Sequence, residues 1–557
     1  MVFTLGRHST GPPLRGVAPC LALCIGLASC GGGAGRGPVS SGSGAAQFPE
    51  PPAGSAFLNA NDADLLVRTA AATANSDTMA IAVVDRLGRI LAVWKGMNTP
   101  AMSASNLGVM VPTEELAVSL ARTAAFFSND QAPLSSRTVR FISGIHFPPG
   151  IANTPNADLY GIENTNRGCV LSTSFLPGQE IPLPRLIGGT PSHLGIITGK
   201  RDIMDRAGND VQAIGDVNPG GVPIFKDDPV LGTSHLAGGI GISGAPLDVA
   251  EFVAFSGAGL AGVPAAQTDG IGFHFPLPTP GVVVVGGIEL PFVNNTSAPS
   301  DLQPPSGTFN SAQYVVTPVD SAGPPPDLWL VGPNDGPVGG LKAADVMKIA
   351  DNAVATANQT RAVIRLPIGS RARMMIAVAD LDGTIIGLFR MHDATIFSID
   401  VATSKARNVI YFSGSNRSAT DLPGVPMGTA VTNRTISFGA QPFYPPGIDG
   451  SSPGPFFNLF LEDTANACTE GAHVSSSNQG AHSNQSGIVF FPGSVPLYVN
   501  GQLVGGLGVS GDGVDQDDFV TAGGMVGFEA PANTRADQVL DQGVRLPYLK
   551  FPRNPTD

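Results

Sequence analysis

The side chains best suited to chemistry stand next to one another at Arg390-Met391-His392. An imidazole and a thioether can both ligate a transition metal, and a guanidinium binds carboxylates through two parallel hydrogen bonds. Adjacent residues on a strand point to opposite faces, so Met391 and His392 cannot enter the same pocket. A histidine just beyond a strand is also commonly solvated, and the sequence leaves that alternative open.

Two glycine-rich strings have the spacing of a dinucleotide-binding fingerprint. The pattern Gly-x-Gly-x-x-Gly occurs at 239–244 and again at 506–511. The second string follows the hairpin turn Asn500-Gly501, so its strand is antiparallel to its neighbour, whereas the fingerprint requires a parallel β-α-β unit. Glycines at alternate strand positions indicate instead that a helix or a flat ligand approaches the sheet closely.

Several other kinds of site are excluded by their spacing. The acidic group Asp512, Asp515, Asp517 and Asp518 does not fit a calcium loop and is typical of the start of a helix. The sequence contains no His-Glu-x-x-His, no Gly-x-Ser-x-Gly and no Cys-x-x-Cys-His motif. Because the net charge is −13 and no cluster of Lys and Arg occurs, nucleic acid is not a predicted partner.

The elements that must position these residues occur twice in the chain. The block at 58–62 (LNAND) returns as 341–345 (LKAAD). Three more blocks return in the same order: 80–88 as 375–383, 148–151 as 445–448, and 238–244 as 505–511. Solenoid repeats are only about 20 to 50 residues long, so each unit is predicted to be a whole domain.

Each unit has the pattern of an α+β domain with an antiparallel sheet. An amphipathic helix is followed by a hairpin around Asp85–Gly88 or Asp380–Gly383, then by a helix, a second hairpin and a short helix. The predicted organisation is a first domain at 57–257 with an insert at about 152–219, a Gly/Pro-rich connector at 258–340, a second domain at 341–530 and a tail at 531–557. Within the connector, residues 281–293 could form an added hairpin between the units.

The N-terminus has the features of a bacterial lipoprotein signal peptide at 1–29. Arginines precede an apolar run that is too short to span a bilayer, and small residues lead to Cys30. We expect cleavage before Cys30, lipid on its thiol, a disordered tether at 30–56, and a lipid-anchored position in the cell envelope, at the outer membrane facing the periplasm or the surface. An ordinary secretory peptide with an incidental Cys30 is the alternative.

Two cysteines lie at nearly equivalent positions in the two units. Cys169 follows Ile151 by 18 residues, and Cys468 follows Ile448 by 20. In an oxidising compartment they could form a disulfide across a pseudo-twofold axis between the units. Two buried thiols are an equally acceptable reading.

The motifs of the second unit form a series. They are IAVADLDG at 376–383, LFRMHDA at 388–394, SIDVATSKA at 398–406, and VPLYVNGQLVGGLGVSG at 495–511 followed by acidic residues. This series resembles the GlcG/HbpS family of haem-binding proteins. The resemblance implies two tandem GlcG/HbpS-like domains fused as an intrachain pseudodimer. The first unit departs from the pattern, because Val93-Trp94-Lys95-Gly96-Met97 stands where the second unit has its Arg-Met-His sequence.

The resemblance also implies a site and a function. His392 is the implied axial ligand of a non-covalent haem, with Met391 beside it, Arg390 as a propionate partner and Lys405 as a further cofactor-binding residue. The implied function is binding of haem or a related tetrapyrrole for scavenging, storage or redox sensing, with further oligomerisation as a possibility. An enzyme that degrades haem or acts on a small hydroxy acid, and an accessory lipoprotein without a ligand, are the alternatives, and the sequence does not decide whether the chain catalyses a reaction.

Overall fold

The described part of the chain begins at residue 49. The computed structural model describes residues 49–104, 110–144, 157–166, 186–187, 190–191, 218–273, 283–285, 287–290, 292–305, 309–448, 450–465 and 487–556. The predicted signal peptide and the three cysteines Cys30, Cys169 and Cys468 lie outside these ranges. Among the described residues, no helix is long and apolar enough to cross a bilayer.

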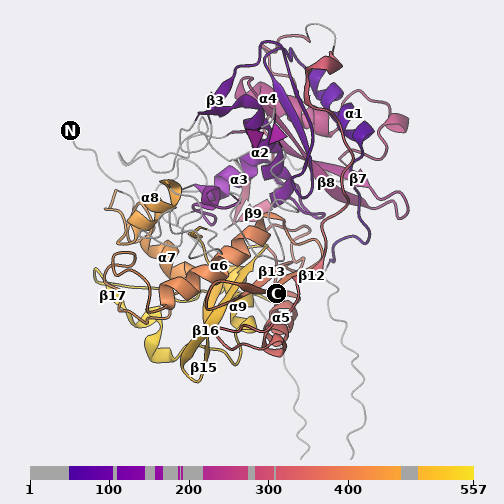
Figure 1. The fold of residues 1–557 in the computed structure, drawn as a ribbon. Coiled ribbons are helices and arrows are strands. Elements are labelled where there is room, and N and C mark those ends of the chain that lie inside the picture. Colours follow the sequence, from indigo (N-terminus) through magenta and orange to yellow (C-terminus); the bar gives the residue numbers. More distant parts are fainter. Residues whose placement is uncertain are drawn as a thin grey trace, which may run out of the picture. The chain divides into compact units, whose positions relative to one another are not determined.

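The first half is built on a five-stranded antiparallel sheet with the strand order β11-β2-β1-β8-β7. Its strands are β1 (Ala80–Asp85), β2 (Ile90–Lys95), β7 (Gly221–Asp227), β8 (Ser234–Ser243) and β11 (Tyr314–Val316), and its helices are α1 (Ala60–Ala71), α2 (Thr113–Phe127), α3 (Ser136–Ser143) and α4 (Leu247–Ala258) (Figure 1). The predicted turn between β1 and β2 is confirmed: the Gly88 amide donates to the Asp85 carbonyl at 2.9 Å, and Gly88 has a φ of 78°.

The second half repeats this architecture with the strand order β12-β14-β13-β16-β15. Its strands are β12 (Leu328–Val331), β13 (Met375–Asp380), β14 (Ile385–Arg390), β15 (Ser494–Val499) and β16 (Gln502–Ser510), and its helices are α5 (Ala343–Ala357), α6 (Phe397–Ser413), α7 (Asn433–Gly439), α8 (Phe457–Ala465) and α9 (Val514–Gly524). The α+β class with antiparallel sheets, predicted from the sequence, is confirmed. Short strands pair as β3 (Met102–Ala104) with β4 (Met110–Pro112), β5 (Leu186–Ile187) with β6 (Thr190–Pro191), β9 (Val283–Val285) with β10 (Ile288–Leu290), and β17 (Leu540–Asp541) with β18 (Val544–Arg545).

Helices cover both faces of the first sheet. Along β1, Ala82 and Val84 belong to the core that includes α2, whereas Ile81 and Val83 belong to the core that includes α1 and α4. All six residues of β1 are therefore buried. A strand covered on both faces needs a continuous apolar run rather than an alternating one, which explains the sequence at 80–84.

Glycines in the central strands let one helix of each half lie directly on the sheet. A Cβ atom at Gly241 would meet the Ala117 carbonyl oxygen of α2 at 1.9 Å, and one at Gly508 would meet the Ala402 carbonyl oxygen of α6 at 2.0 Å. No side chain fits in either place. The Gly-x-Gly strings thus serve close helix packing, as the sequence indicated.

The connector is part of both sheets rather than a simple spacer. It supplies the edge strand β11 to the first sheet and the edge strand β12 to the second. Its residues 283–285 and 288–290 form the added hairpin, and Val283, Val285 and Leu290 are buried in the core that spans both halves. Sequence patterns miss β11 and β12 because each has only three or four residues.

Matching contacts show that the two halves are built alike. The Arg122 Nε atom donates to the Gly88 carbonyl at 2.9 Å, and the Arg407 Nε atom donates to the Gly383 carbonyl at 2.9 Å. Two ion pairs also correspond between the halves: Arg137 with Glu251 in the first half, and Arg434 with Asp518 in the second. These pairs fix which residues of the two halves are equivalent.

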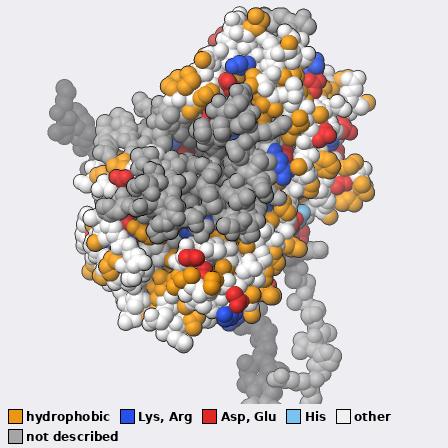
Figure 2. Space-filling view, viewed as in Figure 1, with side chains coloured by type: hydrophobic (Ala, Val, Ile, Leu, Met, Phe, Trp, Pro, Cys, Tyr) orange, Lys and Arg blue, Asp and Glu red, His pale blue; other side chains and the backbone are white. Residues whose placement is uncertain are grey.

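The described surface carries few charges. On the face shown in Figure 2, acidic and basic side chains are scattered among hydrophobic and neutral polar ones. This distribution agrees with the low content of charged residues, 13%.

Candidate functional site

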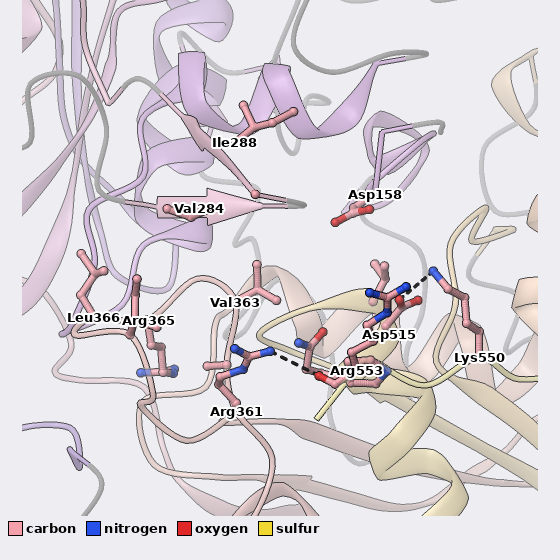
Figure 3. Close-up of a pocket in the computed structure, with 16 residues that line it drawn as sticks. Asp158, Val284, Ile288, Arg361, Val363, Arg365, Leu366, Asp515, Lys550 and Arg553 are labelled. Carbon is pink, nitrogen blue, oxygen red and sulfur yellow. Dashed lines mark hydrogen bonds and ion pairs between the residues drawn. The ribbon is translucent and has the colours of Figure 1, made fainter. Parts of the chain in front are cut away.

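A cavity of about 750 Å³ lies where residues of both halves and of the C-terminal tail meet. Ligand sites usually measure roughly 300 to 1,000 Å³, so its size is in the range of small-molecule and cofactor sites. Figure 3 shows Asp158, Val284 and Ile288 on one side of this space, with Arg361 and Arg553 opposite. The other lining residues are Gly287, Ala362, Val363, Arg365, Leu366, Ile368, Val514, Asp515, Gln516, Lys550 and Pro552.

The apolar walls of the cavity come from separate parts of the chain. The β9–β10 hairpin supplies Val284 and Ile288, and the loop between α5 and β13 supplies Val363 and Leu366. That loop is held in place because the Val363 amide donates to the Asp512 carbonyl at 2.8 Å. Aliphatic walls of this kind suit a flat apolar ligand.

Two guanidinium groups at the cavity have no carboxylate partner among the described residues. Arg361 donates through Nη2 to the backbone carbonyl of Arg553 at 3.4 Å, and its own amide donates to the Pro555 carbonyl at 2.7 Å. These bonds hold the tail against the loop and leave both side-chain charges unneutralised. By contrast, Lys550 already pairs with Asp515 at 2.9 Å.

Arg365 also lines the cavity, but acidic side chains of the protein already neutralise its charge. It is fully buried and forms ion pairs with Asp393 and Asp512. Asp393 in turn pairs with Arg86 of the first half. This buried network joins the halves, so Arg365 is not available to a ligand.

Asp158 is the one carboxylate of the cavity without a hydrogen-bonding or ion-pairing partner in the described part of the chain. Its segment is fixed by neighbours, since the Leu159 amide donates to the Ile142 carbonyl at 2.6 Å and the Tyr160 ring stacks on Phe460. Burial raises the pKa of Asp158 to about 6, and the nearby Asp515 carboxylate adds to the rise. A ligand in the cavity would meet an acceptor that lacks a donor.

A narrow recess of about 30 Å³ continues from Asp158 toward α6. Its walls include Phe127 and Phe397, whose rings stack with centroids 4.1 Å apart. Asp517 lines the recess, and the buried Lys405 ammonium donates to the Asp517 carboxylate at 2.9 Å and to the Val509 carbonyl at 2.8 Å.

The two charges of this pair both lie in the interior. Burial lowers the pKa of Lys405 and raises the pKa of Asp517 to about 7. The Asp517 Oδ1 atom is buried and has no hydrogen-bond partner among the described residues. The mostly apolar wall of the recess therefore includes the carboxylate of Asp517.

The equivalent positions of the first half, which the structure describes, hold no such pair. Because Arg122 corresponds to Arg407, the residue equivalent to Lys405 is Leu120. Because Glu251 corresponds to Asp518, the residue equivalent to Asp517 is Ala250. The buried ion pair distinguishes the second half from the first.

The residues predicted from the sequence do not all meet. Arg390 is buried, donates to the Ala394 carbonyl at 2.6 Å and pairs with Asp327, and burial lowers its pKa to about 10. Met391 is buried, and its sulfur accepts from the Met374 amide at 3.4 Å. Neither side chain lines the large cavity.

His392 lies at a different place from the large cavity. Its Nδ1 atom is 2.8 Å from the Asp327 carboxylate, its side chain is 47% exposed, and its hydrogen bond to Asp327 raises its pKa. The pocket beside it has a volume of about 160 Å³ and is lined by charged residues such as Arg86 and Asp130. The structure thus brings His392 and Arg390 together at Asp327, while Lys405 pairs with Asp517, which lines the recess.

Sequence reasoning missed Asp158, Arg361 and Arg553. They belong to the insert, to a loop and to the tail, and none of them stands in a motif. Only tertiary structure brings them to one cavity, so no local sequence signal could have identified them.

The family comparison concerns the second half. Residues 341–525 match the family model described as "Haem degrading protein HbpS-like". No curated protein sequence matches the chain.

Three solved structures are similar to parts of the chain. The ORFY protein of Klebsiella pneumoniae has 18% identity and a TM-score of 0.21, covering 33% of this chain and 88% of its own. A PduOC:heme complex has 19% identity and a TM-score of 0.21, covering 35% and 98%. A double mutant of HbpS from Streptomyces reticuli has 18% identity and a TM-score of 0.18, covering 34% and 87%. The match to the family model alone identifies residues 341–525 as an HbpS-like domain.

Proposed function

We propose that this chain binds haem or a related tetrapyrrole in the cavity between its halves. The observation that carries the proposal is the pair of unneutralised guanidiniums, Arg361 and Arg553, beside apolar walls. A tetrapyrrole of the haem type has a wide apolar face and two propionates. Guanidinium groups are well suited to hold carboxylates, and aliphatic side chains suit the rings.

The cavity fits the propionates better than it fits an iron atom. Haem iron is usually held by His, Cys, Met or Tyr, and none of these is among the described residues that line the cavity. The proposal therefore rests on contacts of the protein with the propionates and the rings of the ligand, and it includes no protein ligand to iron. Ligation by His392, implied by the sequence resemblance, would place the ligand elsewhere.

An absorption titration of the full chain with hemin and with protoporphyrin tests the proposal. We expect saturation at one equivalent, and we expect the double variant Arg361→Gln/Arg553→Gln to bind at least about 10-fold more weakly because two charge-assisted contacts are lost. The matched control is Arg545→Gln, since Arg545 is exposed and does not line the cavity. If the double variant binds as the wild type does while His392→Ala does not bind, the ligand lies at His392 and not in the cavity.

We further propose that the first half is a diverged second copy of the HbpS-like domain, so that the chain forms an intrachain pseudodimer. The equal strand order of the two sheets and the matched ion pairs support this proposal. The first half differs from the second at the recess, because Leu120 and Ala250 stand where the second half has the buried pair Lys405 and Asp517. A separately expressed second half that exposes apolar surface and self-associates would agree with it; a stable monomer would not.

The proposed cellular role is that of a lipid-anchored tetrapyrrole carrier of the cell envelope, acting in scavenging, storage or sensing. The Cys30 sequence context supports the anchor. Fractionation of cells that express Cys30→Ser tests it. Release of the variant from the membrane fraction is expected, and retention would contradict the anchor.

A further inference from the structure

We propose that the ligand of the cavity is an open-chain tetrapyrrole, whose ring N–H groups donate to the Asp158 carboxylate while its two propionates meet Arg361 and Arg553. This inference rests on the proposed function and narrows it from tetrapyrroles in general to one class. It makes Asp158 a binding residue that selects the ligand.

The first argument is the state of Asp158. Its carboxylate lies at the junction of the large cavity and the recess, and it has no partner in the described part of the chain. Asp158 is only partly buried, so water can reach its carboxylate; a ligand that filled the cavity would exclude that water, and the carboxylate would then be costly unless the ligand donated hydrogen bonds to it. A ligand that supplies N–H donors at this position would remove that cost.

The second argument is where the donors of each ligand point. In an iron porphyrin the four ring nitrogens bind the metal and donate nothing. In a closed, metal-free macrocycle the N–H groups point to the centre of the ring. In an open chain of pyrrole rings, several N–H groups can turn toward one acceptor, so a single carboxylate at the side of the cavity can serve them.

The third argument is the arrangement of charges around the cavity. Figure 3 shows Asp158 on one side and the two guanidiniums of Arg361 and Arg553 on the other. A ligand with donors along one edge and carboxylates along the opposite edge matches this arrangement. Because burial raises the pKa of Asp158 to about 6, the group is still mainly ionised at pH 7, and donors from a ligand would favour that ionised form further.

The test compares three probes on the full chain: biliverdin, hemin and zinc protoporphyrin. All three carry two propionates, but only biliverdin has ring N–H groups. We expect biliverdin to bind tightest, by roughly 10-fold or more, and Asp158→Asn to remove this preference while leaving the affinities for hemin and zinc protoporphyrin within about two-fold. The matched control is Asp301→Asn, because Asp301 is exposed and does not line the cavity.

The outcomes separate this inference from the proposed function. Equal or tighter binding of hemin, or an unchanged preference in Asp158→Asn, overturns the open-chain class but leaves a tetrapyrrole site in the cavity. Failure of all three probes to bind overturns both. Retained hemin binding in the variant shows that its cavity is still folded, so a lost preference cannot be ascribed to unfolding.

Discussion

The buried pair Lys405 and Asp517 leads to a quantitative prediction. The two halves share one architecture, yet Leu120 and Ala250 occupy the equivalent positions in the first half. The variants Lys405→Leu and Asp517→Ala, alone and together, therefore convert the second half to the arrangement that the first half already uses. Each single change leaves one charged group buried without its partner, whereas the double change removes both.

The expected magnitudes follow from burial. Removing one partner of a buried ion pair costs about 3 to 5 kcal/mol, so each single variant should lose that much unfolding free energy. In the double variant no isolated charge remains, and the main loss is the hydrogen bond from Lys405 to the Val509 carbonyl at 2.8 Å, about 1 to 2 kcal/mol. The coupling energy between the two sites should be about 4 kcal/mol or more.

Urea denaturation followed by tryptophan fluorescence measures these values. Trp94 lies in the first sheet and Trp329 in the second, so one probe reports on each half. The control Lys342→Leu breaks an exposed pair with Asp335 and should cost far less stability than either single variant of the buried pair, because solvent screens the exposed pair. If the losses of the two single variants simply add in the double variant, the reasoning about the buried pair is wrong.

The same pair gives a pH signature. An Asp side chain ionises near 3.8 when unfolded, whereas the pKa of folded Asp517 is about 7. Between these values the folded state holds the extra proton, so acidification favours the folded state. Lys405 lowers the pKa of Asp517, so this pKa rises further in Lys405→Leu, and the variant gains more stability from acidification than the wild type does. The loss in Lys405→Leu should therefore shrink between pH 7.5 and pH 5.

Three further predictions concern the other charged residues. Arg365→Gln should cost about 3 to 5 kcal/mol in urea denaturation, because it leaves Asp393 and Asp512 buried without their shared cation. Burial alone would raise the pKa of Asp393, but Arg365 and Arg86 lower it below its ordinary value of 3.8. The contribution of Asp393 to stability is therefore present above pH 3.8 and is lost as the pH falls through the lower folded pKa. Acid unfolding should accordingly become less steep below pH 3.8 in Arg365→Gln than in the wild type. His392→Ala should cost less than about 1 kcal/mol of unfolding free energy, since the pairing of His392 with Asp327 is half exposed. The same variant should leave tetrapyrrole affinity unchanged, because His392 does not line the large cavity. A titration showing weaker binding would contradict the proposal that the ligand lies in that cavity.

Much of the fold could be predicted from sequence because it depends on local patterns. The duplication, the β1–β2 turn at Asp85–Gly88 and the Gly-x-Gly strings each leave a signal within a few residues, and the structure places them as expected. The edge strands β11 and β12 could not be predicted in this way. They are three and four residues long, and they are strands only because a longer strand pairs with each of them.

The candidate site was harder to predict for the same physical reason. Arg390, Met391 and His392 are adjacent in sequence, but the strand and the turn that follow send them to different surroundings. Asp158 and Arg553 are far apart in sequence, and neither stands in a motif. What brings them together is the packing of an insert and a tail onto the HbpS-like domain, which depends on contacts that no periodicity reports.

A crystal structure of the full chain with a bound tetrapyrrole would test the proposed site most directly. We predict ligand density in the cavity, with the propionates within hydrogen-bonding distance of the Arg361 and Arg553 guanidiniums. Density centred on the His392 imidazole, with the cavity left to solvent, would contradict the proposed site.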